Sequence, residues 1–368
     1  MKSSRLRDYG LSIGTLPTGP LNAITDVAGV KVGHTTLISG SGKLEPGKGP
    51  IRTGVTVILP HDDNLFREKV RAACYTINGT GKICGLEEVR ELGLIEAPIG
   101  LTGTLNVGLV CDAIIQHAIK QSPEIGITTG SINVVVGETN DRVLNDLQGR
   151  HVRAEHVFAA LASASGGLPQ EGAVGAGTGT VCYDWKGGIG TSSRVLPESL
   201  GGYTIAALVQ ANFGDSEHFT VCGVPVGQKF LPPSEKPIVD ANMGSIIVIL
   251  ATDAPLTSRQ LQRLCVRATS GLGRTGSIFG ATSGDFVVSF TTAYRIPHQA
   301  PSLVAELPVI LDERNIISTM FHAVAECVEE SVLNALFSAE TMTGINDVTK
   351  YAVPKEEIAA LVKKAQVI

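Results

Sequence analysis

Residues 240–255 read DANMGSIIVILATDAP, and the rest of the chain is organised around them. The five aliphatic residues 246–250 lie between Gly244 and Pro255, a pattern typical of a short strand that is buried on both faces. Because glycine adopts backbone angles that are closed to other residues, the peptide bond between Gly244 and Ser245 can be held in a strained geometry without a steric clash. Such strain would favour attack by the Ser245 hydroxyl on the carbonyl group that precedes it.

The Gly244-Ser245 pair also has an ordinary structural interpretation. Glycine followed by serine is common where a turn leads into a hydrophobic strand. A serine at the mouth of a buried strand is rigidly held in either case. These two residues by themselves therefore leave both interpretations open, and other motifs must decide between them.

The length and composition of the chain favour one large α/β domain. The 368 residues would suffice for two average domains, but no stretch is long and polar enough to be a linker, so we predict a single domain over residues 1–368. Charged residues make up 18% of the chain, compared with roughly 25% in an average globular protein. This composition indicates large internal layers rather than a charged binding surface. The 42 glycines follow no period and indicate tight turns and close backbone approaches.

Several classes of partner and location are disfavoured by the sequence. The net charge of -5 and the absence of clustered Lys and Arg argue against a nucleic-acid partner. No run of 18 apolar residues and no secretory signal pattern is present, so no membrane span is expected and the location is predicted to be cytoplasmic. The seven cysteines are odd in number and widely spaced, which is typical of reduced core cysteines. The histidines lack the spacing of a zinc site, so no metal is expected.

The pattern of apolar residues predicts alternating strands and helices. The strands are expected at 24–37, as a pair with a turn at Ala28-Gly29, and at 53–60, 132–137, 203–212 and 246–250. The helices are expected at 107–119, 153–164, 257–267, 319–339 and 355–364. Thr257 and Gln260 form a capping-box pattern at the start of the fourth helix, and Gly271 and Gly273 are expected to stop it. These elements indicate an α/β sandwich of strands and flanking helices.

Four segments together match the motifs of a known family in order and spacing. They are GSIIVILATDAPL at 244–256, VQANFG at 209–214, GET at 137–139 and SGD at 283–285. From about Ile24 to Gly344, the chain resembles the self-cleaving N-terminal-serine aminopeptidases, peptidase family S58, which include the L-aminopeptidase D-amidase/D-esterases and the β-peptidyl aminopeptidases. The resemblance implies a four-layer α-β-β-α sandwich, similar to N-terminal nucleophile hydrolases but with different connectivity. It also implies a homotetramer of processed heterodimers that needs no cofactor.

In this family the precursor splits before a serine. The resemblance therefore implies division into chains 1–244 and 245–368, with Ser245 as the N-terminal nucleophile of the second chain. Its free α-amino group would act as general base, and an acyl-enzyme on Ser245 would release an N-terminal amino acid from short peptides, amides or esters. Asn212, whose ordinary interpretation is a turn residue, would present its amide to the oxyanion. The polar stretch 228–242 would become the exposed tail of the first chain.

Three residues are implied to contact the substrate. Glu138 falls on the glutamate of the family's Gly-Glu-Thr motif and would meet a substrate ammonium or the N-terminal amine, although a solvated loop carboxylate is the ordinary interpretation. Asn140 stands where the family carries an aromatic residue, a departure that indicates an altered substrate preference. Asn78 belongs to a turn that, in the family, lies near the incoming amino group, and a bare turn remains the alternative. The resemblance does not decide between L-, D- and β-amino acids.

A second serine and a carboxylate complete the implied site. Ser283 lies 38 residues after Ser245, as the family's Ser-Gly-acid motif requires. On that alignment Ser283 would relay a proton to the N-terminal amine and Asp285 would orient it, whereas two ordinary turn residues are the alternative interpretation. The family carries glutamate at the acidic position, so the shorter Asp285 has less reach.

Two other functions stay open from the sequence. One is an acyltransferase of related fold, which would pass the acyl group to an amine instead of water. The other is nucleotide binding by the glycine-rich loop Gly172 to Gly179. No Lys-Ser or Lys-Thr closes this loop as in a P-loop, and it runs into a hairpin-like pattern with an expected turn at 186–188.

Overall fold

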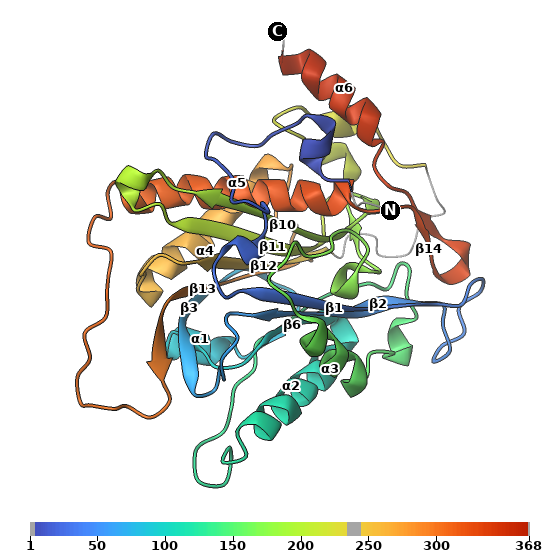
Figure 1. Ribbon diagram of the computed structural model, residues 1–368. Coiled ribbons are helices and arrows are strands. Elements are labelled where there is room, and N and C mark those ends of the chain that lie inside the picture. The colour runs from blue at the N-terminus through green and yellow to red at the C-terminus, as the bar shows by residue number, and fades with distance from the viewer. Residues whose placement is uncertain (1–3, 234–243, 367–368) are drawn as a thin grey trace.

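Two β-sheets form the centre of the computed structural model, which describes residues 4–233 and 244–366 (Figure 1). The first sheet has the strand order β1-β2-β6-β7-β4, and the second has the order β10-β11-β12-β13-β3-β5. The strands of the first sheet are β1 (Lys31–Ser39), β2 (Ile51–Leu59), β4 (Ile83–Cys84), β6 (Ile99–Gly103) and β7 (Val136–Thr139). The strands of the second sheet are β3 (Glu68–Gly79), β5 (Leu94–Ile95), β10 (Gly188–Val195), β11 (Thr204–Asn212), β12 (Ser245–Thr252) and β13 (Gly284–Pro297).

Two short ribbons and nine short 3-10 helices complete the described backbone. The ribbons pair β8 (Val181–Cys182) with β9 (Trp185–Lys186) and β14 (Met342–Thr343) with β15 (Thr349–Lys350). The 3-10 helices are η1 (Leu6–Tyr9), η2 (Ile24–Asp26), η3 (Thr104–Asn106), η4 (Leu147–Gly149), η5 (Gly175–Gly177), η6 (Glu198–Leu200), η7 (Ser216–His218), η8 (Val226–Gln228) and η9 (Ile345–Asp347). The β8–β9 ribbon lies beside the end of β11, since the Val181 nitrogen of β8 donates to Asn212 Oδ1.

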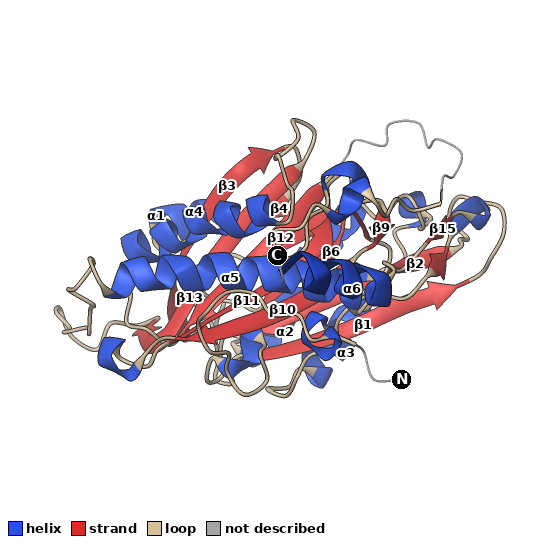
Figure 2. Cartoon of the chain, turned by 90° about the horizontal axis from the view of Figure 1, so that it is seen from above, coloured by secondary structure: helices blue, strands red, loops and turns tan. Residues whose placement is uncertain are grey.

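Helices cover the outer face of each sheet (Figure 1). The α-helices are α1 (Leu86–Glu91), α2 (Val107–Gln121), α3 (Ala154–Ser163), α4 (Ser258–Arg274), α5 (Ile316–Phe337) and α6 (Lys355–Gln366). Helices α2 and α3 pack on the first sheet, whereas α4 and α5 pack on the second, and Figure 2 shows α5 running across β10 and β11. In the described part of the chain, none of these helices combines the length and apolar character needed to cross a membrane.

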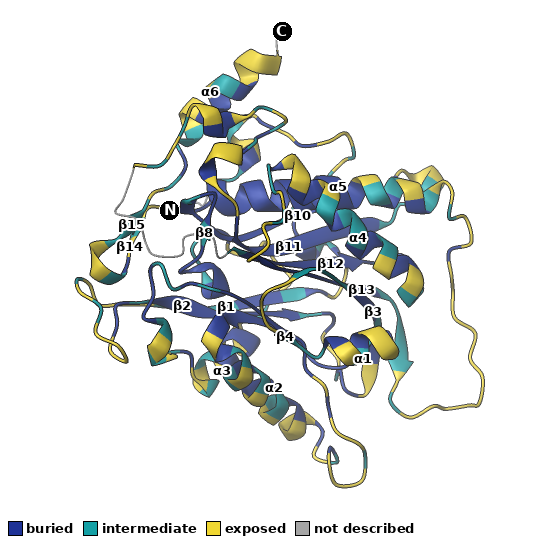
Figure 3. Ribbon diagram, turned by 180° about the vertical axis from the view of Figure 1, so that it is seen from behind, coloured by how far each residue is buried: buried dark blue, intermediate teal, exposed yellow. Residues whose placement is uncertain are grey.

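The core between the sheets is mostly aliphatic. Ile58 and Leu101 of the first sheet share one buried cluster with Ile247, Ile249 and Val288 of the second. Figure 3 shows the strands and most of α5 as buried, whereas α2 and α3 carry exposed residues on the sides that face away from the sheet. Alternate residues of the second sheet point to its other face, where they pack on α4 and α5. Since both faces of these strands are covered, an apolar run without polar alternation is the expected sequence.

Strand β12 contains the buried strand predicted at 246–250 from the sequence. All eight of its residues are buried, which confirms the interpretation of the apolar run. It lies antiparallel to β11 and parallel to β13, so that Ser245 is opposite Asn212 on one side and Gly284 on the other. The first residue of β12 therefore lies beside the last residue of β11 and the first residue of β13, at the same end of these strands.

Several other predicted elements are confirmed within a few residues, among them β2, β11, α2, α3, α5 and α6. The capping box at the start of α4 is also confirmed, since the Thr257 side chain accepts a hydrogen bond from the Gln260 backbone nitrogen. The predicted stop of this helix is wrong, because α4 continues through Gly271 to Arg274. A Cβ at Gly271 would lie 2.6 Å from the carbonyl oxygen of Ala325 on α5, so this glycine permits close helix packing.

Two strand predictions need correction. Residues 24–37 form no strand pair, because the Asp26 carboxylate accepts the backbone hydrogens of Leu21 and Ala23 and closes the turn η2. A single strand, β1, follows at Lys31–Ser39. The strand predicted at 132–137 begins only at Val136. Its first part is held by a side chain instead, since the Asn133 nitrogen donates to Glu96.

Candidate active site

Ser245 occupies the first position of β12 and is only 4% exposed. Its Oγ accepts two hydrogen bonds at 3.4 Å, one from the backbone nitrogen of Asn140 and one from the side-chain Nδ2 of Asn212. Asn212 is the last residue of β11, and Asn140 follows β7 in the opposite sheet. Three strand ends from two sheets thus converge on one hydroxyl group.

The orientation of the Asn212 amide is determined by a neighbouring backbone group. The Val181 nitrogen donates to Asn212 Oδ1 over 2.9 Å. Because this bond occupies the oxygen end of the amide, the NH₂ end points toward Ser245. An amide held in this way is a preorganised donor for negative charge that develops beside Ser245.

The carbonyl group of Gly244 also has a donor. The Gly284 backbone nitrogen donates to the Gly244 oxygen over 3.1 Å, next to the pairing of Ser245 with Gly284. A side chain at Gly244 would be crowded, since its Cβ would lie 3.1 Å from Ser283 Oγ and 3.3 Å from the Cα of Phe213. Glycine before Ser245 is therefore explained by close packing. The hydrogen bond from Gly284 polarises the carbonyl that Ser245 would attack.

Buried Ser283 and Asp285 form a hydrogen-bonded group with half-buried Asn78 beside Gly244. Ser283 Oγ donates to Asp285 Oδ1 over 2.6 Å, so the shorter carboxylate does reach the serine. Asn78 Nδ2 donates to the other carboxylate oxygen over 3.2 Å, and Asn78 lies opposite Asp285 in the β3–β13 pairing. Burial raises the pKa of Asp285, and the bonds from Ser283 and Asn78 oppose that rise. The side chain of Asn78 thus supports Asp285.

Glu138 lies at the end of β7 and is 4% exposed. Its Oε1 accepts the backbone hydrogen of Lys82 over 2.9 Å and lies 3.8 Å from the Lys82 Nζ. Burial raises the pKa of Glu138, while the hydrogen bond and the charge of Lys82 oppose that rise. The Lys82 ammonium also donates to Thr104 Oγ1 over 2.7 Å. Glu138 is thus a buried carboxylate with one ammonium already beside it.

Asn140 faces the nucleophile through its backbone. Its side-chain Oδ1 accepts the backbone hydrogen of Arg142 over 3.2 Å, within the loop that follows β7. The backbone nitrogen is the group that reaches Ser245. A donor to the reacting centre is thus present although the family's aromatic side chain is not, because the donor comes from the main chain.

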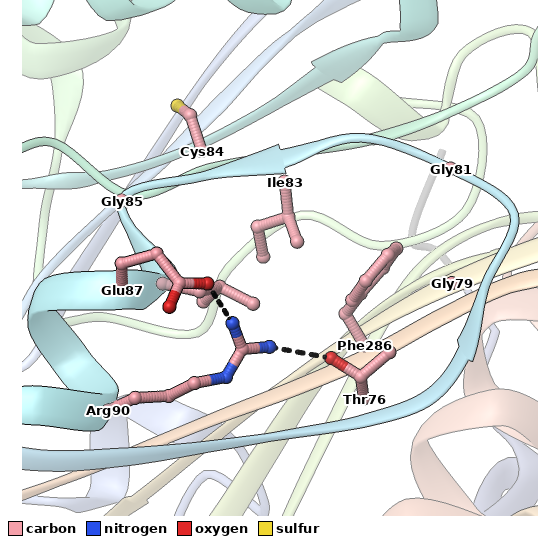
Figure 4. Close-up of a pocket in the computed structure, with 10 residues that line it drawn as sticks. Thr76, Gly79, Gly81, Ile83, Cys84, Gly85, Glu87, Arg90 and Phe286 are labelled. Carbon is pink, nitrogen blue, oxygen red and sulfur yellow. Dashed lines mark hydrogen bonds and ion pairs between the residues drawn. The ribbon is translucent and has the colours of Figure 1, made fainter.

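A pocket of about 470 Å³ lies beside the turn that joins β3 to β4 (Figure 4). It is lined by Thr76, Gly79, Gly81, Ile83, Cys84, Gly85, Leu86, Glu87, Arg90 and Phe286. Arg90 bonds to Glu87 and to Thr76 at its outer end. At the inner end, a Cβ on Gly81 would lie 3.2 Å from the Phe286 ring and 3.3 Å from Glu138 Oε1. The pocket therefore adjoins the surroundings of Glu138.

The glycine-rich loop is used inside the protein and does not form a phosphate cradle. The backbone hydrogens of Gly175 and Ala176 are donated to threonine hydroxyls of β1 and β2, and that of Gly177 to a carbonyl in the loop. The loop continues into the β8–β9 ribbon and not into an α-helix. It therefore lacks the backbone amides of a helix N-terminus, which bind phosphate in a P-loop. The expected turn at 186–188 is wrong, because the ribbon turns at Tyr183 and Asp184, which both have positive φ.

A model of peptidase family S58 matches residues 22–350. The chain belongs to peptidase family S58. The β-peptidyl aminopeptidase BapA of Sphingosinicella xenopeptidilytica is 42% identical, over 98% of this chain and 91% of that protein. A Burkholderia sp. β-aminopeptidase structure is 39% identical with a TM-score of 0.89, over 98% of this chain and 99% of that chain. The L-aminopeptidase D-Ala-esterase/amidase of Ochrobactrum anthropi, described as a variant of the Ntn hydrolase fold, is 38% identical with a TM-score of 0.90 and the same coverage.

The predicted family and activity class are therefore confirmed. This S58 chain is an aminopeptidase/amidase with the α/β fold of the Ntn-type serine aminopeptidases. The structure brings Ser245, Asn212 and the backbone of Asn140 into one hydrogen-bonded group, and Ser283 with Asp285 into another. The two groups meet at Gly244.

Several groups of this S58 site were missed by sequence reasoning. The backbone nitrogens of Val181 and Gly284 carry no signal in the sequence, because every residue except proline has such a donor. Lys82 follows the Asn78 turn and meets Glu138 only through the pairing of β4 with β7. Within residues 4–233 and 244–366, no three His, Cys, Asp or Glu side chains gather where they could hold a metal ion.

Proposed function

We propose that this S58 aminopeptidase is made as one chain and splits itself between Gly244 and Ser245. The proposal rests above all on the position of Ser245 Oγ, which is buried at the start of β12 between two N–H donors at 3.4 Å. The neighbouring Gly244 carbonyl, which accepts a hydrogen bond from Gly284, is the group that Oγ would attack. Residues 234–243, which would end the first chain, lie outside the described residues.

The splitting reaction converts an amide into an ester and then into two chain ends. Ser245 Oγ adds to the Gly244 carbonyl carbon, the C–N bond breaks, and the hydroxyl proton passes to the departing amine of Ser245. Water then adds to the ester, which releases the Gly244 carboxylate and restores the Ser245 hydroxyl. Chains 1–244 and 245–368 result. The new α-amino group has an unperturbed pKa of about 7.7–8.0, which suits a general base near neutral pH.

In the mature enzyme the same hydroxyl would attack the carbonyl of the substrate's first residue. The α-amino group of Ser245 takes the hydroxyl proton and later delivers it to the leaving amine or alcohol. The amide of Asn212 and the backbone hydrogen of Asn140 stabilise the oxyanion. Ser283, held by Asp285, orients the α-amino group. Water finally hydrolyses the acyl-enzyme on Ser245.

Glu138 would bind the free ammonium of the substrate and limit the enzyme to one N-terminal residue. The proposal is supported by its burial and by its place on β7, two residues before Asn140, whose backbone nitrogen donates to Ser245 Oγ. A charged hydrogen bond of this kind contributes about 1.5–3 kcal/mol. Asn78 and Asn140 shape the site around the substrate, since both lie at strand ends that border it.

Lys82→Met is expected to move the lower of two acid-side ionisations of kcat/KM, that of Glu138, to higher pH, whereas the upper one belongs to the α-amino group of Ser245. Glu138 must be ionised to bind an ammonium, and the charge of Lys82 favours the ionised form. Without Lys82, burial acts with less opposition, so the pKa of Glu138 rises further and activity is lost at a higher pH as the pH falls. A pH profile of kcat/KM measures the shift. Lys48→Met, which replaces an exposed lysine paired with Glu45, is the control, and an unmoved lower ionisation in Lys82→Met would contradict the role of Glu138.

We further propose that the split chains remain in one four-layer domain and form a cytoplasmic homotetramer. β12 and β13 of the second chain pair with β11 and β3 of the first, so splitting would leave the sheet intact. An oligomer contact would cover Leu303, Val304 and Leu311, which are exposed in the loop before α5. The seven cysteines are all unpaired, which suits a reducing compartment.

Mass spectrometry of the purified protein tests the splitting. Under denaturing conditions we expect two masses that meet at Gly244 and Ser245, and under native conditions the mass of four heterodimers. The mass measured under denaturing conditions tests the splitting reaction, because it reports a broken peptide bond whether or not the chains assemble. A single full-length mass in a preparation that nevertheless hydrolyses amino-acid amides would refute self-splitting as the source of the nucleophile.

A further inference from the structure

Lys186 is a fully buried lysine whose ammonium bonds only to backbone oxygens. It ends β9, and its side chain is 0% exposed. The Nζ donates to the carbonyls of Gly177, Thr180 and Gly187 over 3.1, 2.8 and 2.7 Å. In the described part of the chain no carboxylate pairs with it. Burial lowers the pKa of Lys186 to about 7. The three carbonyl acceptors take all three hydrogens of an ammonium, whereas a neutral amine has only two, so this site is built for the charged form.

One of the three carbonyls belongs to the peptide group that holds the oxyanion donor. Thr180 C=O and Val181 N–H are the two ends of one planar peptide unit. Its oxygen accepts from Lys186 Nζ over 2.8 Å, and its N–H donates to Asn212 Oδ1 over 2.9 Å. Asn212 Nδ2 in turn donates to Ser245 Oγ over 3.4 Å. An unbroken chain of hydrogen bonds therefore leads from the buried ammonium to the nucleophile.

Every donor in this chain points toward Ser245. A cation at a peptide oxygen withdraws electron density from that peptide, which strengthens its N–H as a donor. The same effect passes through the Asn212 amide, because its oxygen accepts the strengthened bond and its NH₂ group faces the reacting centre. Thr180 and Asn212 are themselves buried, so solvent screens the effect little. The chain both fixes the amide and increases its positive potential.

We propose that Lys186 is a positioning residue for catalysis, which holds and polarises the oxyanion donor Asn212 through the Thr180–Val181 peptide group. This role rests on the proposed function of Ser245 and Asn212. It also gives the glycine-rich loop a purpose that nucleotide binding does not supply. The carbonyls of Gly177 in the loop and of Thr180 just after it form two of the three contacts of the ammonium, and a Cβ at Gly177 would lie 2.5 Å from the Ile189 nitrogen. Glycine at that position thus lets the loop lie against β10.

A double-mutant cycle of Lys186→Met and Asn212→Ala tests the inference. Removal of one oxyanion donor typically lowers kcat by about 10²–10³. We expect Lys186→Met to lower kcat by about 10- to 100-fold with KM changed less than about threefold, since the donor acts on the transition state. In the Asn212→Ala background, the same substitution should cost less than about threefold, because its target is gone. The rate of splitting and kcat per split chain are both measured.

The controls separate this role from general destabilisation. Lys355→Met replaces a half-buried lysine at the start of α6 and should leave kcat unchanged. Thermal unfolding checks that each variant is folded, and Lys186→Gln takes the place of Lys186→Met in the cycle if the methionine variant does not fold. The inference would be overturned if Lys186→Met lowered kcat by the same factor with and without Asn212. It would also be overturned if Lys186→Met changed only KM. If Ser245→Ala retains activity, the proposed function itself fails, which is a different result.

Discussion

Ser245→Ala is expected to remain a single full-length chain and to lose hydrolysis of amino-acid amides by a factor on the order of 10⁴ or more. Both losses have the same cause. The Oγ is the atom that would attack the Gly244 carbonyl in the precursor and the substrate carbonyl in the mature enzyme. Alanine keeps the fold of β12, because position 245 is buried and a smaller side chain fits there. Denaturing mass spectrometry and a chromogenic amide assay measure the two effects.

The control for this variant is Ser163→Ala, at the end of α3. Ser163 Oγ donates to the carbonyl of Ala160 in its own helix and has no contact with the site. This variant should split and hydrolyse amides like the natural enzyme. A Ser245→Ala protein that still splits between residues 244 and 245 would show that another group is the nucleophile, and a split but inactive one would separate the two reactions.

Asn212→Ala is expected to lower kcat by about 10²–10³ while KM changes little. The amide donates to Ser245 Oγ in the resting structure and would donate to the oxyanion once negative charge develops. Because the bond strengthens as that charge forms, its loss raises the activation barrier more than it weakens substrate binding. The substitution also frees the Val181 N–H, which would lose its acceptor on a side chain. Steady-state kinetics per split chain measures the effect.

Asn64→Ala is a matched control for this experiment. Asn64 Nδ2 donates to Ser122 Oγ at the end of α2, far along the chain from β11. Its loss should leave kcat unchanged within about twofold, as surface polar substitutions usually do. If Asn212→Ala were equally harmless, the oxyanion would have to be held by backbone donors alone, of which the Asn140 nitrogen is the one in contact with Ser245.

The predictions were correct where contacts between residues close in sequence decide the structure. The apolar run of β12 and the capping box at Thr257 depend on residues within one element, so the sequence predicted both. The predicted stop at Gly271 failed because a glycine inside a helix has two uses, as a terminator or as a point of close approach. The distance to Ala325 on α5 selects the second use, and that distance comes from a segment about 50 residues away.

The strand pair expected at 24–37 failed for a similar reason. Alternation around glycines does fit strands, and β1 does follow at Lys31–Ser39. The first half of the segment instead turns against the second sheet, where the Ile24 nitrogen donates to Thr191 Oγ1 over 2.7 Å. The Ile24 backbone hydrogen therefore bonds to Thr191 on β10 and not to the hairpin partner that the sequence pattern predicted.

By itself, the sequence predicted the family, the activity class, the buried strand β12 and the candidate residues of the site, because each depends on a short motif that is contiguous in the chain. Ser245, Asn212, Glu138 and the pair Ser283–Asp285 were all candidates on that basis. Only the tertiary structure decided how they act on one another. The strand register sets Asn212 and Gly284 on either side of Ser245.

The supporting groups were also decided by the tertiary structure alone. Val181, Gly284, Lys82 and Lys186 reach the site through a backbone hydrogen, a loop carbonyl or a strand pairing. Backbone donors are present at nearly every residue, so their use depends on which chain segment packs beside them. The candidate reactive side chains could therefore be predicted from the sequence, whereas their orientation depends on packing between distant segments.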